Sequence, residues 1–540
     1  MPVISNLPAA LNLGSLEIEG LPALNGVPLS AQDLPPVASS QLDSWIALAQ
    51  RTRGQFSIIA RSGDTSIAVT DLGGSYPVFQ NLHRSGCDFG TSLDSVTKGE
   101  RSTLSVEAAS RYIAFGTVGV GLNLVEGVRA LPSASITICE KGKTTSTGWF
   151  DWLGAAKPSG DSVEDLEKEF RGLIASWAAA YLPKEGKVGL LLSAGTDSGL
   201  LTALMKPILG DRLVCFTQDF FNARYSERAG AEETARRVGA RIIVVPIKRR
   251  DYFNAVQKLN ASSQDTAVHQ AEAYNMYCLA SFAKKQGIDT LITGYNADYL
   301  FLGMEHFHAG LPRDREEYRK VVSQLSAGDK ASRVMGHTPV LTDFIRDILG
   351  ALNIPASEFS RQVEQVRSER RRSLTDMGGK AELLTLLQLG GQIDGGLAWQ
   401  DEHGCLAVMR ALPGTTILCP FYDSEIISFA LKLPLELLFN EGRNKFLLRK
   451  MLKDETGLER PKKPASLSPA RLWRLFFNPS EYRSVSPLLR KYYLRLWLRN
   501  FLGRGRRTHE LTTAAALGRW LQSHAVQLPE SRSTRTPASN

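Results

Sequence analysis

The sequence has no long apolar run and few cysteines, and both scarcities narrow the class of protein. None of its 540 residues falls in an apolar stretch of about 18, the length that a membrane span needs. The six cysteines are widely scattered, and no pair has the spacing of a metal site or of a short secreted disulfide framework. The N-terminus lacks a charged segment followed by an apolar one, so no signal peptide is predicted. We therefore expect reduced thiols and a cytoplasmic location.

Acidic residues are scarce in one part of the chain. Between Arg460 and Arg507 there are thirteen Lys or Arg residues and a single acid, Glu481, although the whole chain has a net charge of only +9. Such a stretch attracts anions in general. A site for small polyanions such as nucleotides is the favoured interpretation, and nucleic-acid binding is the weaker alternative. Apolar residues at helical spacing within 472–476 and 492–497 predict amphipathic helices with their arginines turned outward.

The length of the chain exceeds what one hydrophobic core serves and predicts two domains or more. Residues 1–155 are predicted to be β-rich, because short alternating or apolar runs such as 56–60 and 66–69 are separated by Gly and Asp turns. A linker is predicted near Pro158, and Ser162 is a candidate N-cap for the helix that follows.

Residues 163–510 alternate between helical and strand patterns and are predicted to form a second domain. Strands separated by helices of this length are typical of a doubly wound α/β fold with a parallel sheet. In such sheets ligands bind beyond the carboxyl ends of the strands. Residues 525–540, rich in Ser, Thr, Arg and Pro, are predicted to be a disordered tail. The predicted helices span about 163–181, 228–239 and 269–286, and the predicted strands 188–192, 213–217, 241–246 and 289–293.

The segment 192–198, between a predicted buried strand and a helix, has the composition of a phosphate-binding loop. Small residues let backbone amides approach a phosphate closely, and the helix N-terminus adds a partial positive charge. The hydroxyls of Ser193 and Ser198 can donate hydrogen bonds to phosphate oxygens. The alternative is an ordinary Ser/Gly turn that caps a helix. The predicted nucleotide-binding residues of this first loop are Leu192, Ser193, Ala194, Gly195, Thr196, Asp197 and Ser198.

Two aspartates predict a magnesium site. A carboxylate beside a phosphate is repelled unless a cation lies between them, so Asp197 implies Mg²⁺. A second loop, 293–298, follows another predicted strand and carries Asp298. Two carboxylates that flank a triphosphate can hold one or two magnesium ions, which polarise the α-phosphate and the leaving pyrophosphate. Asp197 and Asp298 are therefore the predicted metal ligands, with a plain helix N-cap as the alternative for Asp298.

Four segments together carry a family signature. They are Ser193–Ser198 (SAGTDS), Thr293–Asp298 (TGYNAD), Pro420–Asp423 (PFYD) with Leu433, Pro434 and Gly442–Arg449, and Arg460–Lys462 (RPK). They resemble the SGGxDS pyrophosphate loop, the second adenylate loop, the PFLD…LP…K..LR stretch and the R-x-K of class B asparagine synthetases and their relatives, the β-lactam synthetases. This resemblance implies a PP-loop ATP pyrophosphatase domain that uses ATP and Mg²⁺, with Leu192, Thr293 and Gly294 near the nucleoside.

The N-terminal part resembles the Ntn-type amidotransferase domain of the same family, a β-rich sandwich. Family members that hydrolyse glutamine have a cysteine as residue 2, whereas this sequence has Pro2, and its first cysteine is Cys87. Without that thiolate there is no acyl-enzyme chemistry. The resemblance therefore implies an inactive glutaminase-like domain and an amine from another source. The matching positions are Gly54–Phe56, Asp71, Gly74, Pro77–Phe79, Leu124–Gly127, Leu131 and Pro132.

The resemblance also implies three catalytic residues. Tyr295 stands where asparagine synthetases usually carry Glu, and the second loop is similar to the TGYGxD of β-lactam synthetases and carbapenam synthetase. There a tyrosine, paired with a glutamate, helps to deprotonate the attacking amine, and Glu402 is the candidate for that glutamate. Lys462 matches the lysine that lies over the reacting carbonyl, with Lys463 as the fallback. The alternatives are a packed core tyrosine, a surface acid in a glycine-rich loop and a solvated basic run.

Two positions depart from the family pattern. Ala194 replaces a glycine of the first loop, and its methyl group would crowd the pyrophosphate if that position needed a positive φ. After Arg460–Lys462 the family often shows Gly and a small or acidic residue, but here Lys463 and Pro464 follow.

The predicted function is the ATP-dependent formation of an amide bond through an acyl-adenylate. The substrate is an amino-acid-like small molecule or a peptide, and the favoured product is a lactam of the β-lactam type, closed within one molecule. The alternatives are a lasso-peptide macrolactam cyclase, an ammonia-dependent asparagine synthetase-like enzyme and a non-catalytic nucleotide-binding homologue. No membrane partner is expected, and the oligomeric state is left open, with a homodimer as one alternative.

Overall fold

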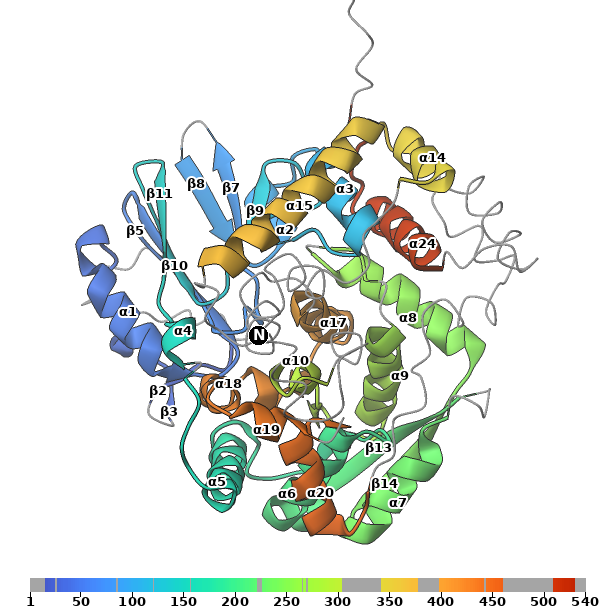
Figure 1. Cartoon of the computed structure of the whole chain (residues 1–540). Coiled ribbons are helices and arrows are strands. Elements are labelled where there is room, and N and C mark those ends of the chain that lie inside the picture. Colours follow the sequence, from blue (N-terminus) through green and yellow to red (C-terminus); the bar gives the residue numbers. More distant parts are fainter. Residues whose placement is uncertain are drawn as a thin grey trace, which may run out of the picture.

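The computed structural model describes residues 15–529, except for 25–26, 84–85, 120, 156, 221–225, 265, 269–270, 304–340, 377–397, 441–442 and 460–507. Figure 1 shows the antiparallel strands of the N-terminal part at the upper left and the parallel-sheet region below and to the right. The change from antiparallel to parallel sheets falls between β11 (Lys143–Gly148) and β12 (Val188–Leu191), across α4 (Trp152–Ala155) and α5 (Val163–Tyr181). No described helix is both long and apolar enough to cross a membrane.

Two antiparallel sheets dominate the N-terminal part, in agreement with the predicted β-rich region. A five-stranded sheet has the order β1-β5-β6-β10-β11, and a three-stranded sheet has the order β8-β7-β9. Ile59, Ala68 and Phe89 belong to one buried apolar cluster that draws on both sheets. The strand bounds are β1 (Ser15–Gly20), β5 (Phe56–Ser62), β6 (Thr65–Thr70), β7 (Phe79–His83), β8 (Gly86–Gly90), β9 (Val128–Ala130) and β10 (Ser135–Glu140).

A buried carboxyl group, Asp71, organises the turn after β6. It accepts hydrogen bonds from the backbone N–H groups of Phe56 (2.7 Å) and Ser75 (2.9 Å). Burial raises the pKa of Asp71 to about 6, although these hydrogen bonds oppose the shift. The turn closes through Gly74, whose φ is +70° and whose N–H donates to the Asp71 carbonyl. Asp71 thereby fixes the start of β5, the strand that follows Gln55.

Five parallel strands form the second sheet, in the order β14-β13-β12-β15-β16, and every neighbouring pair is parallel. The chain runs outward from β12 through β13 to β14 and then returns to the other side of β12 with β15. The switch point of the sheet therefore lies between β12 and β15, where ligands bind in such folds. The remaining bounds are β13 (Leu213–Phe220), β14 (Arg241–Ile247), β15 (Thr290–Ile292) and β16 (Thr416–Leu418).

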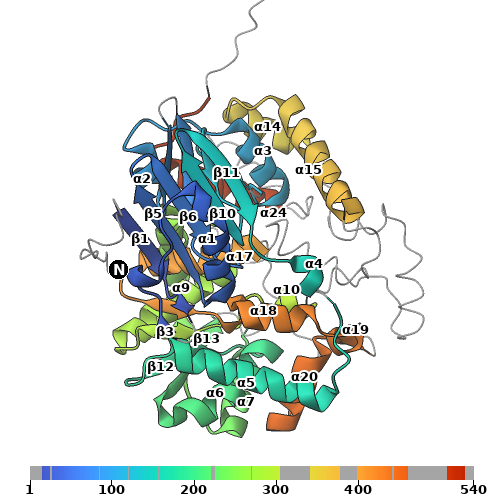
Figure 2. The same ribbon diagram turned by 90° about the vertical axis from the view of Figure 1, so that its left-hand side faces the viewer.

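Helices cover both faces of the parallel sheet, which confirms the predicted doubly wound α/β fold. Cys215 of β13 packs in the cluster shared with α5, α6 (Thr196–Leu209), α7 (Arg228–Val238) and α20 (Phe446–Thr456). Its neighbours Val214 and Phe216 pack instead with α8 (Arg249–Ser262), α9 (Ala271–Lys285) and α17 (Ala398–Ala411). This alternation follows from the two-residue period of a strand buried on both faces. Figure 2 shows α5, α6, α7 and α20 together on the lower side of the molecule.

The predicted helix starts and strands in this region are close to those observed. The helix predicted at 163–181 is α5, and its N-cap is Ser162, whose hydroxyl accepts from the N–H of Asp165 at 3.1 Å. The elements that were not predicted include α8, α17 and the three-residue strand β16. The amphipathic helices predicted within 472–476 and 492–497 lie outside the described residues.

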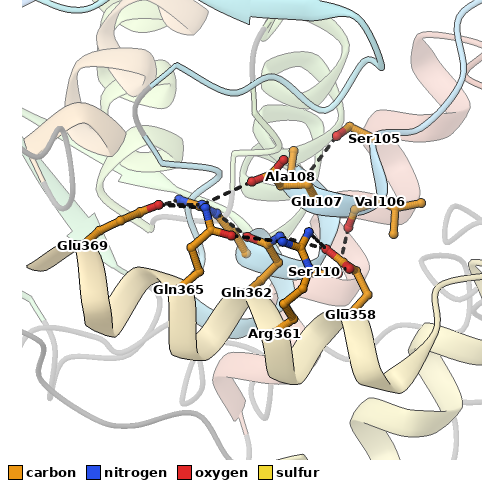
Figure 3. Close-up of polar contacts among 11 residues, drawn as sticks. Ser105, Val106, Glu107, Ala108, Ser110, Glu358, Arg361, Gln362, Gln365 and Glu369 are labelled. Atoms are coloured by element: carbon orange, nitrogen blue, oxygen red, sulfur yellow. Dashed lines mark hydrogen bonds and ion pairs between the residues drawn. The ribbon is translucent and has the colours of Figure 1, made fainter.

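A third group of helices joins the two ends of the chain. Arg111 of α3 (Val106–Phe115) donates hydrogen bonds to Gln362 (2.8 Å) and Glu369 (3.1 Å) on α15 (Ala356–Asp376). Figure 3 shows these two acceptor side chains on α15. Helices α14 (Asp343–Ala351) and α24 (Thr508–Ser523) share the apolar cluster beneath. After α24, Gln527 forms a parallel bridge with Thr103. The described chain therefore continues past residue 525, the predicted start of the disordered tail: Gln527 exchanges backbone hydrogen bonds with Ser102 and Leu104, and the side chain of Asn353 donates to the carbonyl of Pro529.

The remaining elements are short or peripheral. They are β2 (Ala23–Leu24), β3 (Val27–Pro28), β4 (Thr52–Arg53), α1 (Leu42–Arg51), α2 (Leu93–Thr97), α10 (Ala297–Leu300), α18 (Ser424–Leu431), α19 (Leu435–Leu438), β17 (Phe439–Asn440) and β18 (Arg443–Asn444), with 3-10 turns at Ala31–Asp33, Ser39–Gln41, Gly210–Arg212 and Pro420–Tyr422.

Candidate active site

The first loop joins β12 to α6 and is closed by its own serine hydroxyls. The N–H of Ser193 donates to the Oγ of Ser198 at 3.0 Å, and the two Oγ atoms lie 2.9 Å apart. The N–H of Gly195 in turn donates to the Oγ of Ser193 at 3.0 Å. The loop is thus held in shape from within, with Thr196 opening the helix.

The steric objection to Ala194 does not arise. A methyl group would crowd the loop only if this position adopted a positive φ, and Ala194 is not among the positive-φ residues. Gly195, the N-cap of α6, has an extended conformation with φ of −77° and ψ of 165°. The first loop therefore accommodates alanine without backbone strain.

The second loop joins β15 to α10 and lies directly against the first. A Cβ atom on Gly294 would stand only 3.3 Å from the Cβ of Asp197 and from the backbone nitrogen of Ser198. Asn296 has φ of +67° and holds the N-cap position of α10, so the alternative of Asp298 as the N-cap is wrong. Asp298 instead lies in the first turn, with half of its side chain exposed.

The two predicted metal ligands converge on one ammonium group, that of Lys445. Its Nζ lies 2.5 Å from the Oδ2 of Asp197 and 2.6 Å from the Oδ1 of Asp298. Only 6% of the Lys445 side chain is exposed. Burial alone would lower the pKa of Lys445, but the two carboxylates reverse this effect and raise the pKa above its ordinary value. Lys445 is therefore positively charged at neutral pH.

Glycine at position 303 leaves room for the charged side chains of Asp298 and Lys445. A Cβ atom there would stand 1.9 Å from the Oδ1 of Asp298 and 2.1 Å from the Cε of Lys445, which real atoms do not tolerate. Lys445 itself adopts φ of +53° at the start of α20, and its N–H donates to the carbonyl of Phe301 at 3.2 Å. The side chain of Asn444 donates to the Gly303 carbonyl at 2.7 Å. Lys445 is thus anchored to the chain that follows the second loop.

The carboxylate pair fits the demands of a magnesium ion with a nucleotide. Mg²⁺ in such sites takes one or two protein carboxylates and fills its other positions with phosphate oxygens and water. Asp197 and Asp298 already share one cation, so their oxygens point to a common position. Among the described residues, no group of three or more His, Cys, Asp or Glu is placed to hold a metal by itself. A metal at this position would depend on phosphate ligands.

The three predicted catalytic residues are placed to different extents. Tyr295 lies in the second loop with a buried hydroxyl, and its carbonyl accepts from the Sγ–H of Cys419 at 2.9 Å. Glu402 is in helix α17 rather than in a glycine-rich loop, because the apolar residues that follow it pack that helix on the sheet. The side chain of Glu402, and the whole of Lys462 and Lys463, lie outside the described residues.

Sequence reasoning missed Lys445, although the stretch Gly442–Arg449 was part of the family-like pattern. The signal was available in the charges: two carboxylates on facing loops, one of them largely buried, favour a cation between them when no metal is bound. Gly303 and Asn296 were also missed, because their roles follow from contacts between segments that the sequence does not bring together.

A doubly wound parallel sheet with an acidic loop on either side of its switch point defines the class: an α/β domain in which ligands are expected at that switch point. Within that class, the profile of the asparagine synthase family matches residues 169–488, more than half of the chain. The chain belongs to the asparagine synthase family.

Individual relatives are distant. The "Asparagine synthetase [glutamine-hydrolyzing] 1" of Bacillus subtilis (strain 168) is 23% identical over 426 residues, which cover 74% of this chain and 65% of that protein. The chain thus matches just under two thirds of that relative's length.

Two solved structures with local similarity are both 14% identical to this chain. One is the NH3-dependent NAD synthetase from Campylobacter jejuni subsp. jejuni NCTC 11168, in complex with nitrate; the match covers 41% of this chain and 99% of that chain, with a TM-score of 0.22. The other is the glutamine-dependent NAD+ synthetase from Acinetobacter baumannii, in complex with ADP; the match covers 47% and 56%, with a TM-score of 0.21. Similarity at this level carries no argument about function.

Proposed function

We propose that this protein is an ATP-dependent amide-bond-forming synthetase that activates a substrate carboxylate as an acyl-adenylate. The observation that carries the proposal is the meeting of Asp197 and Asp298 at the Nζ of Lys445. These carboxylates stand beyond the carboxyl ends of the adjacent strands β12 and β15. Membership of the asparagine synthase family agrees with this chemistry.

The residues of the two loops divide the work of binding ATP. The hydroxyl groups of Ser193 and Ser198, whose oxygens share a hydrogen bond in the free loop, turn their hydrogens to the pyrophosphate part at the positive end of α6. The ammonium group of Lys445 turns from carboxylate oxygens to phosphate oxygens when the nucleotide arrives, because both are anions within its reach. When bound, Mg²⁺ neutralises charge on the α-phosphate and on the leaving pyrophosphate. Leu192, Thr293 and Gly294 lie along the nucleoside.

The amide-forming step falls to three other side chains. The amine attacks the acyl carbon and AMP leaves, while Tyr295, paired with Glu402, helps to deprotonate the amine as a phenolate, whose conjugate acid has a reference pKa of about 10, closer to that of an amine than a carboxylic acid's. Lys462 stabilises the oxyanion of the tetrahedral intermediate, where a positioned cation contributes several kcal/mol.

An intramolecular amine, and hence a lactam product, is the finer proposal. It rests on Tyr295 in the second loop. A peptide macrolactam is the variant for a larger substrate. The second candidate is an ammonia-dependent, asparagine synthetase-like reaction; the Bacillus relative, named a glutamine-hydrolyzing asparagine synthetase, supports its product and not its source of nitrogen. A non-catalytic nucleotide-binding homologue is the remaining alternative.

The test is pyrophosphate exchange into ATP across a panel of amino acids, amino acid derivatives and peptides, followed by the mass of each product. We expect Mg²⁺-dependent exchange with at least one carboxylate substrate. Loss of one water from that substrate identifies a lactam, whereas replacement of a hydroxyl by an amino group in the presence of ammonia identifies the asparagine-type reaction. Absence of both ATP binding and exchange would reject the synthetase proposal.

A further inference from the structure

We infer that Gln55 of the N-terminal part is a positioning residue for Tyr295, acting through Cys419. The contacts themselves do not depend on the reaction, whereas their catalytic meaning rests on the proposed function. They give the N-terminal part a task in the proposed synthetase site.

The second loop is held along its length by residues 418–425, here called the bridging segment. The N–H of Thr293 donates to the carbonyl of Leu418 at 3.0 Å. The Sγ–H of Cys419 donates to the carbonyl of Tyr295 at 2.9 Å, and the side chain of Asn296 donates to the carbonyl of Phe421, also at 2.9 Å. The conformation of the second loop therefore depends on where the bridging segment lies.

The N-terminal part contacts the bridging segment through two residues, Gln55 and Arg53. The Oε1 of Gln55 accepts from the N–H of Cys419 at 3.1 Å. Arg53 donates to Asp423 at 2.9 Å and pairs with Glu425 at 2.7 Å, and the Asp423 side chain is fully buried. Cys419 is thus hydrogen-bonded through its backbone N–H to Gln55 and through its side chain to Tyr295. It links the N-terminal part to the second loop.

The backbone that carries Gln55 is fixed on both sides. Its carbonyl accepts from the N–H of Leu21 at 2.9 Å, and the next residue, Phe56, donates to the buried carboxyl group of Asp71. Gly54 leaves no room for a side chain, since a Cβ there would stand 2.4 Å from the Leu21 carbonyl oxygen. A side chain that starts from such a constrained point can hold a partner at a defined distance.

The contact made by Gln55 reaches the bridging segment, whereas the contact made by Arg111 between distant parts of the chain does not. Arg111 connects the N-terminal part to α15, and the side chains that it contacts, Gln362, Glu369 and Glu107, lie outside the bridging segment. A general loosening between the two parts would follow from the loss of either residue. Displacement of the second loop would follow only from the loss of Gln55.

The test measures hydrogen–deuterium exchange of the backbone amides of residues 293–300 in the full chain. In Gln55→Ala we expect these amides to exchange about 2- to 30-fold faster, the range of coupling through packed contacts. Gln55→Glu keeps an acceptor oxygen and should restore most of the protection. Cys419→Ala, which removes the bond to the Tyr295 carbonyl, should reproduce the effect and serves as the second variant if Gln55→Ala fails to fold.

Two control variants separate positioning from general stability. Gln50→Ala removes another glutamine contact within the N-terminal part, a bond of 3.0 Å to the Trp149 carbonyl. Arg111→Met removes the contact to α15. Neither should change exchange at 293–300. Equal acceleration in Arg111→Met, or no acceleration in Gln55→Ala and Cys419→Ala, would overturn the inference.

The exchange measurement needs no substrate, so its failure is distinct from failure of the proposed function. Once a substrate is known, Gln55→Ala should slow amide formation by about the same 2- to 30-fold and leave pyrophosphate exchange within about twofold. This split between the two half-reactions is what a purely structural role for Gln55 would not produce. Equal loss of both half-reactions would also overturn the inference.

Discussion

The two loops of the site are held in place by different means. The first loop is closed by its own residues, since the hydroxyls of Ser193 and Ser198 accept the backbone N–H groups that fix its shape. The second loop is held from outside, by the bridging segment and, through Cys419, by Gln55. A loop of the first kind keeps its geometry wherever it is placed, whereas a loop of the second kind can be adjusted by a distant part of the chain.

The loops meet at Lys445, which belongs to neither. Under the proposed function, the first loop serves the nucleotide, whereas the second loop serves both the nucleotide, through Asp298, and the attacking amine, through Tyr295. Changes in the first loop or at Lys445 should act on nucleotide binding, and changes in the bridging segment should act on amide formation.

The largest effect is expected for Asp197→Asn. The variant keeps the size of the side chain and removes the charge that a metal needs, so pyrophosphate exchange should fall by about a hundredfold or more. Asp211→Asn is the matched control, because Asp211 lies just after the same helix and its side chain is fully exposed. Exchange that survives in Asp197→Asn at the control level would remove the first loop from the chemistry.

Lys445→Met should destabilise the nucleotide-free protein by about 1–3 kcal/mol, less than the loss of a fully buried pair, because half of the Asp298 side chain is exposed. The two carboxylates then lack their cation. Millimolar Mg²⁺ should raise the melting temperature of this variant more than that of the wild type, as followed by differential scanning fluorimetry. An identical response to Mg²⁺ in both proteins would argue against a shared cation position.

Gly303→Ala should lower the free energy of unfolding by about 1–3 kcal/mol, the range for forcing an extra methyl group into a packed site. The methyl group would displace Asp298 from Lys445 and should weaken binding of Mg·ATP as well. Gly172→Ala is the opposite control: Gly172 lies in α5 with nothing within 4 Å of an added Cβ, so alanine should stabilise the helix by about 0.5–1 kcal/mol. The urea unfolding midpoints of both variants measure these opposite changes in stability.

The smallest effect is expected for Ser198→Ala. The substitution removes the acceptor of the Ser193 N–H. The free energy of Mg·ATP binding should become less favourable by about 1 kcal/mol, which is equivalent to a roughly fivefold weaker affinity. Amide exchange should accelerate in residues 193–198 and stay unchanged in 293–300. Acceleration in both loops would show that the first loop also supports the second, and the contrast between them would be lost.

The sequence predicted the parts of the molecule whose cause is local. The helix at 163–181, the strands at 188–192 and 213–217, and the Ser162 cap follow from periodicity and capping chemistry within a few residues. The first loop was recognisable for the same reason. The pair of Asp197 and Asp298 was expected from strand ends in one sheet, and the observed geometry brings them to one nitrogen atom.

The parts that were not predicted depend on contacts over long sequence separations. Lys445 lies more than two hundred residues from Asp197, and only the assembled sheet brings it there. Strand β16 has three residues, too few for a periodic pattern, and is defined by its pairing with β15. The link from Gln55 to Cys419 connects residues 364 positions apart, and nothing local marks either as a partner.

The central claim is that Asp197 and Asp298 hold one magnesium–nucleotide complex between them. Its most direct test is calorimetric titration of the wild type, Asp197→Asn, Asp298→Asn and the double variant with Mg²⁺ and a non-cleavable α,β-methylene analogue of ATP. Each single variant should bind at least about tenfold more weakly, and the double variant should lose less than the two losses combined, because both residues act on one complex. Unchanged affinity in either single variant would contradict the account.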